Sequence, residues 1–393
     1  VQGQLVALNQ DTGAIEAVVG GFDFTESKFN RSLQGWRQAG STLKPFIYSL
    51  ALERGYTPAS LVNDSPLSFG EGSNAWRPSN SDGQFYGPIR LRRALYQSRN
   101  LVSIRLLQSV GIDNARSYMM RFGFPRDRMQ RNLTLALGSA EVLPVQMAAA
   151  YAAFANGGFH VTPYFIAKVK DNKGNVLFQS TPERVCRECE NLPANEPVPE
   201  PVATEITGEG DAITVTEPPP PAMPFVPDYP VASRIMSARA AWQIQSILRD
   251  VVARGTGRAA LSLGRGDLAG KTGTTNDAKD AWFAGFGGKI VAITWVGFDQ
   301  PKTLGRMEYG GYAALPLWNG FMGPALSGVP EYHPGLPMGL VPVRVKMSTG
   351  QRTSDDDPDG YTDWLQVEKV PAAPIRGPES ETTEPQAAPE DLF

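Results

Sequence analysis

Strand-like segments near both ends of this chain enclose a long helical stretch, and this order constrains the fold more than any other feature. Short apolar runs at residues 5–8 and 15–19 flank turn-forming residues 9–13, a pattern typical of a β-hairpin. Three further strands are expected at 268–275, 281–286 and 290–298. We therefore predict one α+β domain whose sheet is assembled from both ends of the chain.

Helical sequence predominates between about residues 90 and 156, where apolar residues recur at helical spacing. The two clearest series are Leu101, Ile104, Leu107 and Val110, and Met147, Ala150, Tyr151 and Phe154. Gly157-Gly158 is expected to end the last of these helices. A shorter helix is expected between Gly40 and Gly55, since Pro45 is tolerated in a first turn, and another over residues 237–254.

The composition excludes several classes of function. The 393 residues include 37 Lys and Arg against 40 Asp and Glu, a net charge of −3, so no overall positive field attracts nucleic acid or anionic lipid. We interpret the cluster of Arg90, Arg92 and Arg93 as a solvated helix face. The chain has no run of about 18 apolar residues, so no membrane span is predicted. The chain starts in strand-like sequence without Met or signal peptide, so we expect a fragment whose anchor or export signal lies elsewhere.

Two segments differ in composition from the rest. Residues 181–230 are rich in Pro and Glu and are expected to be a disordered or weakly ordered insertion rather than a second core. The chain's two cysteines, Cys186 and Cys189, are expected to form a local disulfide or to remain free thiols. They are too few for a zinc site, so no metal is predicted. Beyond about Val345 the chain is rich in Asp, Pro and Glu and is expected to be a tail.

Three short motifs carry the chemistry, and the first is Ser41-Thr42-Leu43-Lys44. It places a hydroxyl and an amine three residues apart at the start of a predicted helix, so both are expected on one face. A helix N-terminus favours a serine that becomes an alkoxide. Lys44 can act as general base only when neutral, which requires a pKa lowered from about 10.4 to about 7–8 by desolvation and a nearby cation such as Lys271. Taken alone, the motif also fits a helix cap with a surface lysine.

The second motif, Ser98-Arg99-Asn100, falls between two predicted helical segments. Ser98 is a candidate relay that moves a proton between Lys44, Lys271 and a leaving amine. Asn100 is a candidate either to bind a substrate amide carbonyl or to orient Lys44. Both residues also suit a helix cap.

The third motif, Lys271-Thr272-Gly273-Thr274-Thr275, falls in a predicted strand. Gly273 would let a ligand or another backbone approach closely. Thr272 and Thr274 are candidates to bind a substrate carboxylate, with Lys271 supplying charge. The backbone N–H groups of Ser41 and Thr274 are candidates for an oxyanion hole. A basic edge strand is the alternative interpretation.

Together the motifs resemble the S-x-x-K, S-x-N and K-T-G signatures of penicillin-binding proteins and serine β-lactamases, with Arg99 in the middle of the second. Segments 37–46, 98–103, 147–151, 154–158 and 270–275 resemble the class A, bifunctional penicillin-binding proteins of the 1A type. The resemblance covers roughly residues 1–335 apart from the insertion. It implies an antiparallel sheet flanked by helices with a mostly helical subdomain, a transpeptidase domain at 1–335, and a C-terminal extension with an acidic, Pro-rich tail at 336–393.

The activity implied by this resemblance is a D,D-transpeptidase or carboxypeptidase that acts on peptidoglycan stem peptides through a Ser41 acyl-enzyme. The implied catalytic residues are Ser41, Lys44, Ser98 and Lys271, and the implied substrate-binding residues are Asn100, Thr272, Gly273 and Thr274. β-Lactams would be covalent inhibitors, and no cofactor is needed.

The family also implies a glycosyltransferase domain absent from this chain. It further implies a location at the periplasmic face of the bacterial inner membrane through a missing anchor, and an outer-membrane lipoprotein activator among the partners. A serine β-lactamase is one alternative, although the sequence has no Glu-x-x-Leu-Asn segment of the class A lactamase kind. A non-catalytic β-lactam sensor is the other, and the intact Lys44, Ser98 and Lys271 argue against it.

Overall fold

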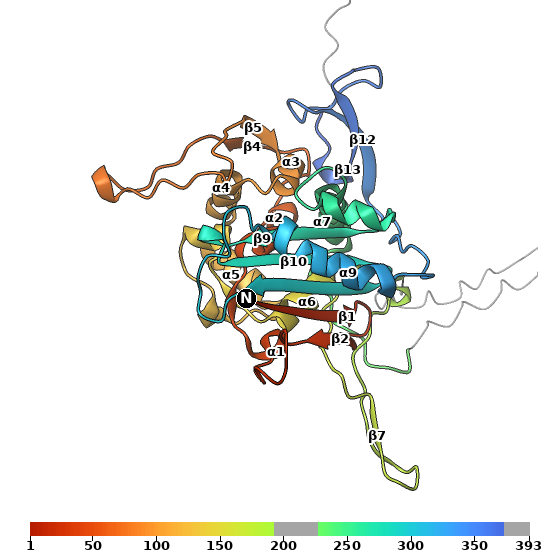
Figure 1. Ribbon diagram of the computed structural model, residues 1–393. Helices are drawn as coiled ribbons and strands as arrows, with labels where there is room; N and C mark the ends of the chain where they lie inside the picture. The colour runs from red at the N-terminus through yellow and green to blue at the C-terminus, as the bar shows by residue number, and fades with distance from the viewer. Residues whose placement is uncertain (192–226, 373–393) are drawn as a thin grey trace, which may run out of the picture.

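A five-stranded antiparallel sheet forms the centre of the molecule (Figure 1). In the computed structural model, which describes residues 1–191 and 227–372, the strand order is β2-β1-β11-β10-β9. The strands are β1 Gln2–Asn9, β2 Ile15–Val19, β9 Ala269–Thr274, β10 Asp280–Gly287 and β11 Ile290–Gly297. The prediction of one sheet assembled from both ends of the chain is confirmed.

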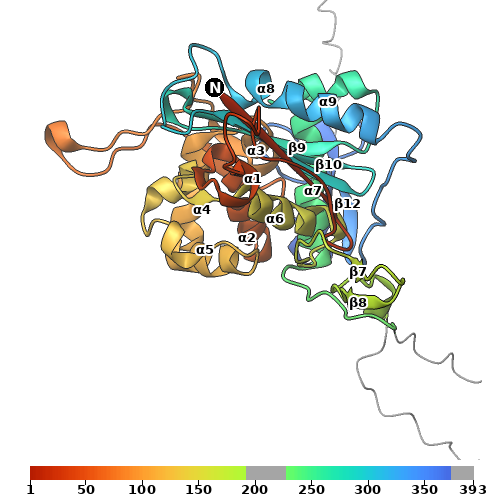
Figure 2. The same ribbon diagram turned by 60° about the horizontal axis from the view of Figure 1, so that its bottom comes forward.

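Both faces of this sheet are buried along β1, β10 and β11, because their side chains alternate between two hydrophobic clusters. In β1, Val6 and Leu8 belong to the larger cluster, whereas Leu5 and Ala7 belong to the smaller one. Helices α8 (Gly310–Ala313) and α9 (Leu315–Ala325) cover the second face, and the larger helical layer lies on the first (Figure 2). The domain therefore has three layers, with the sheet in the middle.

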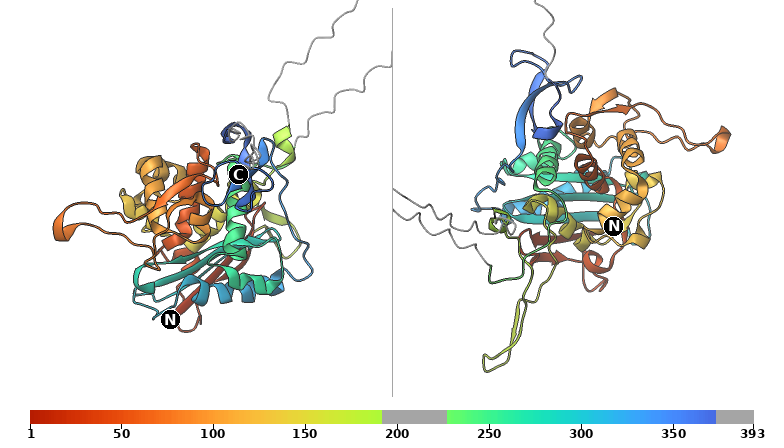
Figure 3. Two further views of the ribbon diagram at one scale, coloured as in Figure 1. Left: turned by 90° about the horizontal axis from the view of Figure 1, so that it is seen from above. Right: turned by 180° about the vertical axis from the view of Figure 1, so that it is seen from behind.

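The larger layer contains the helices predicted from apolar periodicity, and it covers the sheet when the molecule is seen from behind (Figure 3). Its members are α2 Lys44–Glu53, α3 Leu91–Tyr96, α4 Asn100–Val110, α5 Ile112–Met120, α6 Pro144–Asn156 and α7 Ala238–Ala253. The two predicted apolar series are buried at the centre of this layer. Phe46 of α2 lies 5.0 Å from Phe122 and 4.8 Å from Phe154 between ring centroids, which joins α2 to α6.

Smaller elements complete the described chain. Short helix α1 spans Arg31–Gln34, and the two-stranded sheets pair β3 (Arg37–Gln38) with β6 (Glu141–Val142), β4 (Leu61–Asp64) with β5 (Gly87–Arg90), and β7 (Lys168–Lys170) with β8 (Val176–Gln179). The segment between β4 and β5 and the β7–β8 hairpin both extend away from the body (Figure 1). The 3-10 helices are η1 Gly40–Leu43, η2 Gly72–Asn74, η3 Arg126–Arg128, η4 Leu133–Leu137, η5 Glu188–Asn191, η6 Arg258–Leu263, η7 Asn276–Ala278 and η8 Val367–Lys369.

The expectation of a tail beyond Val345 is wrong for the residues described. Strand β12 (Leu340–Lys346) pairs with β13 (Gly360–Gln366), and Val343, Val345 and Leu365 form a third hydrophobic cluster with Ala59. Four Asp residues lie in the connection between the two strands, residues 347–359, and this acidic composition hid the short apolar segment in β13. Residues 373–393 of the predicted tail lie outside the described residues.

The interpretation of the arginine cluster as a solvated helix face is also wrong. Arg92 is buried, and its guanidinium lies 2.9 Å from Asp250 of α7 and 2.6 Å from Asp363 of β13. Arg90 is buried as well and lies over the ring of Tyr361 at 4.0 Å from its centroid. The carboxylate partners of Arg92 come from elements more than 150 residues away, so no local pattern could show them.

The insertion and the cysteines can be followed only in part. Cys186 and Cys189 form a disulfide with an S–S distance of 1.98 Å, which settles the alternative left open by the sequence. Residues 192–226 of the predicted insertion lie outside the described residues. Across the ranges that the structure describes, no helix is long and apolar enough to cross a membrane, and no group of acidic, His or Cys side chains is arranged to hold a metal ion.

Candidate active site

The first motif occupies a tight 3-10 turn that runs directly into a helix. Helix η1 contains Ser41, and α2 begins at Lys44, whose backbone N–H donates to the Ser41 carbonyl. The predicted helix is confirmed, although its first turn is 3-10 rather than α-helical. The Tyr151 hydroxyl of α6 donates to the carbonyl of Thr42 at 2.8 Å and holds this turn in place.

The turn packs against the strand that carries the third motif. A β-carbon on Gly273 would lie 2.7 Å from the Thr42 methyl carbon and 3.0 Å from the Ala39 carbonyl oxygen, so the space left by this glycine is filled by the turn. The predicted close approach of another backbone is thus confirmed. Gly40 has a φ of +54°, and a β-carbon there would lie 2.8 Å from the Thr274 carbonyl oxygen. Ser41 therefore follows directly on a residue in contact with Thr274.

Ser98 lies where the amines of two lysines meet. It connects α3 to α4 with a φ of +60°, a left-handed conformation that is uncommon for residues other than glycine. Its hydroxyl accepts a hydrogen bond from Lys271 Nζ at 2.9 Å and lies 3.3 Å from Lys44 Nζ. Its carbonyl accepts from Lys44 Nζ at 2.6 Å. The structure thus brings residues of all three motifs together.

Lys44 is fully buried and is held by the second motif. Besides Ser98, its Nζ donates to the Asn100 side-chain oxygen at 2.6 Å. Burial lowers its pKa well below the usual value, and the charges of Lys271 and Arg99 lower it further, against the opposing effect of Asp64. Of the two roles considered for Asn100, this contact favours the orientation of Lys44. The acceptors of Lys44 in the described residues do not include the Ser41 hydroxyl, a contact that often tightens only when substrate binds.

Lys271 is buried without a carboxylate partner among the described residues. Its Nζ donates to Ser98 and to the Thr272 carbonyl, the latter at 2.9 Å. Burial lowers its pKa to about 7, because the protonated amine is poorly solvated there. Lys271 therefore changes its charge near neutral pH. The Ser98 hydroxyl lies between its Nζ atom and that of Lys44.

Two residues beside the third motif were missed from the sequence. The Thr256 hydroxyl lies 2.6 Å from the Thr272 hydroxyl, and the Gly310 backbone N–H donates to the Thr274 hydroxyl at 3.1 Å. Both lie in glycine-containing runs, 255–257 and 310–311, which could have marked close backbone approaches. They fix the orientation of the two hydroxyl groups predicted to bind a carboxylate.

Comparison with known proteins agrees with this geometry. The profile of the penicillin binding protein transpeptidase domain matches residues 3–322. Penicillin-binding protein 1A of Pseudomonas aeruginosa is 45% identical over 423 residues, covering 100% of this chain and 49% of that protein. Penicillin-binding protein 1A of Neisseria lactamica is 42% identical, covering 87% of this chain and 38% of that protein.

A solved structure is similar in both sequence and fold. The crystal structure of Penicillin-Binding Protein 1A from Haemophilus influenzae has 39% identity and a TM-score of 0.82, covering 95% of this chain and 54% of that chain. This chain thus spans about half the length, or less, of the curated relatives above. The predicted resemblance to penicillin-binding proteins of the 1A type and the predicted fold are confirmed. With the family profile matching most of its length, the chain belongs to the penicillin-binding protein transpeptidase domain family.

Proposed function

We propose that this chain is a D,D-transpeptidase that cross-links peptidoglycan stem peptides through an acyl-enzyme on Ser41. The observation that carries the proposal is the convergence of two buried amines, Lys44 and Lys271, on the Ser98 hydroxyl beside the turn that bears Ser41. Burial favours the neutral form of an amine, and a neutral amine can accept the proton of a serine hydroxyl. The family of the chain supports the same chemistry.

In the acylation step, neutral Lys44 takes the proton of Ser41, and the serine oxygen attacks the penultimate D-Ala carbonyl of a donor stem peptide. The N–H groups of Ser41 and Thr274 stabilise the oxyanion of the tetrahedral intermediate; one such donor typically contributes about 3 kcal/mol. The C–N bond then breaks, and the proton held by Lys44 passes through Ser98 to the departing amine of the terminal D-Ala. The hydroxyls of Thr272 and Thr274 and the charge of Lys271 bind the donor's terminal carboxylate.

In the second step, an amine from another stem peptide attacks the ester and forms the cross-link. Meso-diaminopimelate supplies this amine in our proposal. Its proton returns through Ser98 and Lys44 to Ser41, so the enzyme is regenerated. Attack by water at the same point gives carboxypeptidase activity. β-Lactams resemble the donor and form a stable ester with Ser41.

For the whole protein we propose the arrangement implied by its longer relatives. A glycosyltransferase domain and a membrane anchor lie outside this chain, and the transpeptidase domain at 1–335 faces the periplasm from the inner membrane. An outer-membrane lipoprotein is the proposed activator.

Labelling with a fluorescent penicillin tests the function. The wild-type protein should form a long-lived adduct, and mass spectrometry of its peptides should place the adduct on Ser41. Ser41→Ala should remove labelling while the melting temperature stays unchanged. A donor stem peptide incubated with the wild-type protein should lose its terminal D-Ala.

The other outcomes distinguish the alternatives. Rapid release of hydrolysed penicillin would identify a β-lactamase. A stable Ser41 adduct without turnover of a stem peptide or thioester substrate would identify a β-lactam sensor. An adduct on any residue other than Ser41 would overturn the proposed mechanism.

A further inference from the structure

Arg99 occupies the middle of the second motif, and the proposed mechanism gives it no task. The residue is 4% exposed, so its charge is taken out of water, and it acts on the pKa of Lys44. A buried arginine costs free energy unless each of its donors is satisfied. The contacts of Arg99 therefore show what this position does.

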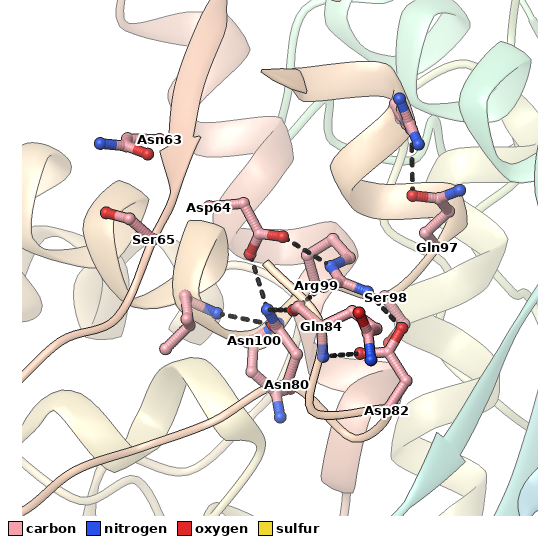
Figure 4. Close-up of polar contacts among 12 residues, drawn as sticks. Asn63, Asp64, Ser65, Asn80, Asp82, Gln84, Gln97, Ser98, Arg99 and Asn100 are labelled. Atoms are coloured by element: carbon pink, nitrogen blue, oxygen red, sulfur yellow. Dashed lines mark hydrogen bonds and ion pairs between the residues drawn. The ribbon is translucent and has the colours of Figure 1, made fainter. Parts of the chain in front are cut away.

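The guanidinium of Arg99 reaches three different acceptors, all on the segment around β4 and β5 (Figure 4). Its Nε donates to the fully buried Asp64 at 2.9 Å, and one terminal nitrogen donates to Asp82 at 2.7 Å. The other terminal nitrogen donates to the Gln84 carbonyl. This span requires a planar, forked side chain, because a single ammonium nitrogen cannot occupy all three positions.

Asn80 extends the same cluster to the start of α4 (Figure 4). Its amide nitrogen donates to Asp64 at 2.8 Å and to the Gln84 carbonyl at 2.9 Å. Its amide oxygen accepts from the backbone N–H of Asn100 at 2.8 Å and supplies the partner that the first turn of a helix lacks. Asn100 in turn donates from its side chain to the Ser79 carbonyl at 2.9 Å.

The second motif is held both by this cluster and by helix α3. The backbone N–H of Ser98 donates to Leu95, and that of Arg99 donates to Ala94, so α3 holds the near side of Ser98. The left-handed conformation of Ser98 is strained and persists only when the residues on both sides of it are held. After Ser98 in the chain, the side-chain contacts of Arg99 hold the backbone in place.

We propose that Arg99, held by Asp64 and Asn80, is a positioning residue that keeps Ser98 and Asn100 in the geometry that receives Lys44 and Lys271. This inference rests on the proposed acylation of Ser41. It also explains why the segment between β4 and β5 is tied to the second motif by buried side chains.

The Arg99→Lys variant separates geometry from charge. It keeps a cation opposite Asp64 but cannot span to Asp82 and Gln84. The acylation of Ser41 by benzylpenicillin is measured by stopped flow at several pH values and divided into binding and acylation constants. We expect the acylation constant to fall by about tenfold or more, since small displacements of catalytic groups have effects of this size. The binding constant should stay within about threefold, because no substrate contact is removed.

The pH profile is the second readout. Arg99 lowers the pKa of Lys44 through its charge, and the Arg99→Lys variant keeps that charge, so the acid limb should stay in place while the plateau falls. The double variant Arg99→Gln with Asp64→Asn removes both buried charges and should show the same fall of the plateau. This double variant tests the positioning role of Arg99 if Arg99→Lys does not fold. Arg105→Lys is the matched control, because Arg105 binds the carbonyls of Asn63 and Ser65 at the same segment without touching the motif.

Acylation by both Arg99 variants within about twofold of wild type, with unchanged melting, would overturn the inference. An equal loss in the Arg105 control would do the same, because it would indicate general loosening of the segment. If the wild-type protein itself is not acylated, the proposed function fails and the role of Arg99 fails with it. Labelled wild type beside unlabelled Ser41→Ala establishes the function independently.

Discussion

Substitution of Gly138 by alanine perturbs the turn around Ser41 without touching any residue of the three motifs. Gly138 follows η4 and has a φ of +81° and a ψ of 37°, a left-handed conformation that favours glycine. Its carbonyl accepts the backbone N–H of Gly40 at 2.9 Å. A β-carbon on Gly138 would overlap the carbonyl group of Gly40 and lie 2.5 Å from its α-carbon.

Two costs follow from this geometry. The left-handed conformation of alanine costs about 1–2 kcal/mol on its own. The backbone of Gly40 must also retreat by more than about 1 Å, because its α-carbon and its nearer carbonyl atoms all lie inside the ordinary carbon–carbon separation of about 3.5–4 Å. The carbonyl that moves belongs to the same peptide group as the Ser41 N–H, so the proposed oxyanion donor moves with it. A displacement of about 1 Å at a catalytic group can cost about a hundredfold in rate.

Penicillin acylation and thermal melting measure the two costs separately. We expect Gly138→Ala to lose about a hundredfold in the acylation rate, more than its loss of stability alone would cause. Gly157→Ala is the matched control, since Gly157 has a φ of +97° and open space where a β-carbon would stand. It should lose about 1–2 kcal/mol of stability and keep its acylation rate. Equal melting and equal acylation in the two variants would refute the claim that Gly138 shapes the active site.

Three further predictions test other contacts. The pKa of Lys271 is about 7 in the folded protein against 10.5 for a free lysine. Between these pH values the unfolded chain binds more protons, so the free energy of unfolding should rise with pH. Lys271→Met should weaken this rise, which denaturant titrations at pH 7 and pH 10 measure. Thr256→Val should raise the KM of a carboxylate-bearing donor by about fivefold with little change in kcat, whereas Thr256→Ser should not, because the hydroxyl bond to Thr272 is worth about 1 kcal/mol. Asp363→Asn should cost about 3–5 kcal/mol by leaving the buried Arg92 with less compensation, whereas Glu368→Gln, in an exposed ion pair, should leave stability almost unchanged. Chemical denaturation of both variants measures the difference.

Local patterns were sufficient to predict the sheet and the motifs. Short continuous apolar runs mark β1, β10 and β11 because each strand is buried on both faces, and apolar residues at helical spacing mark α4 and α6, which lie in the hydrophobic core. The spacing of Ser41 and Lys44 depends only on one helical turn. The order of the three motifs could be read directly, and the contacts between Lys44, Ser98 and Lys271 agree with it.

The burial of charged side chains whose partners are distant in the sequence could not be predicted from local patterns. Arg92 and Arg99 look like surface residues in the sequence, because charge alone does not show whether a partner arrives from elsewhere in the chain. Their carboxylates, Asp363 and Asp64, lie 271 and 35 residues away. The strand that carries Asp363 was hidden by the composition around it. The errors about Arg92 and about the strand that carries Asp363 both concern a contact between segments that are distant in the sequence.

The buried lysines and the strained Ser98 make this site reactive, but they also lower the stability of the fold, so other contacts must offset their cost. A buried lysine loses solvation, and a serine with a φ of +60° is strained, so Lys44, Lys271 and Ser98 each lower stability. Yet burial is what favours the neutral amine, and the strained backbone is what turns the Ser98 carbonyl and hydroxyl toward the same Nζ atom. The compensation comes from α3 on one side of the motif and from Arg99 with Asp64 on the other. Because reactivity and strain have the same origin here, changes that relax Ser98 should stabilise the protein only at the expense of acylation.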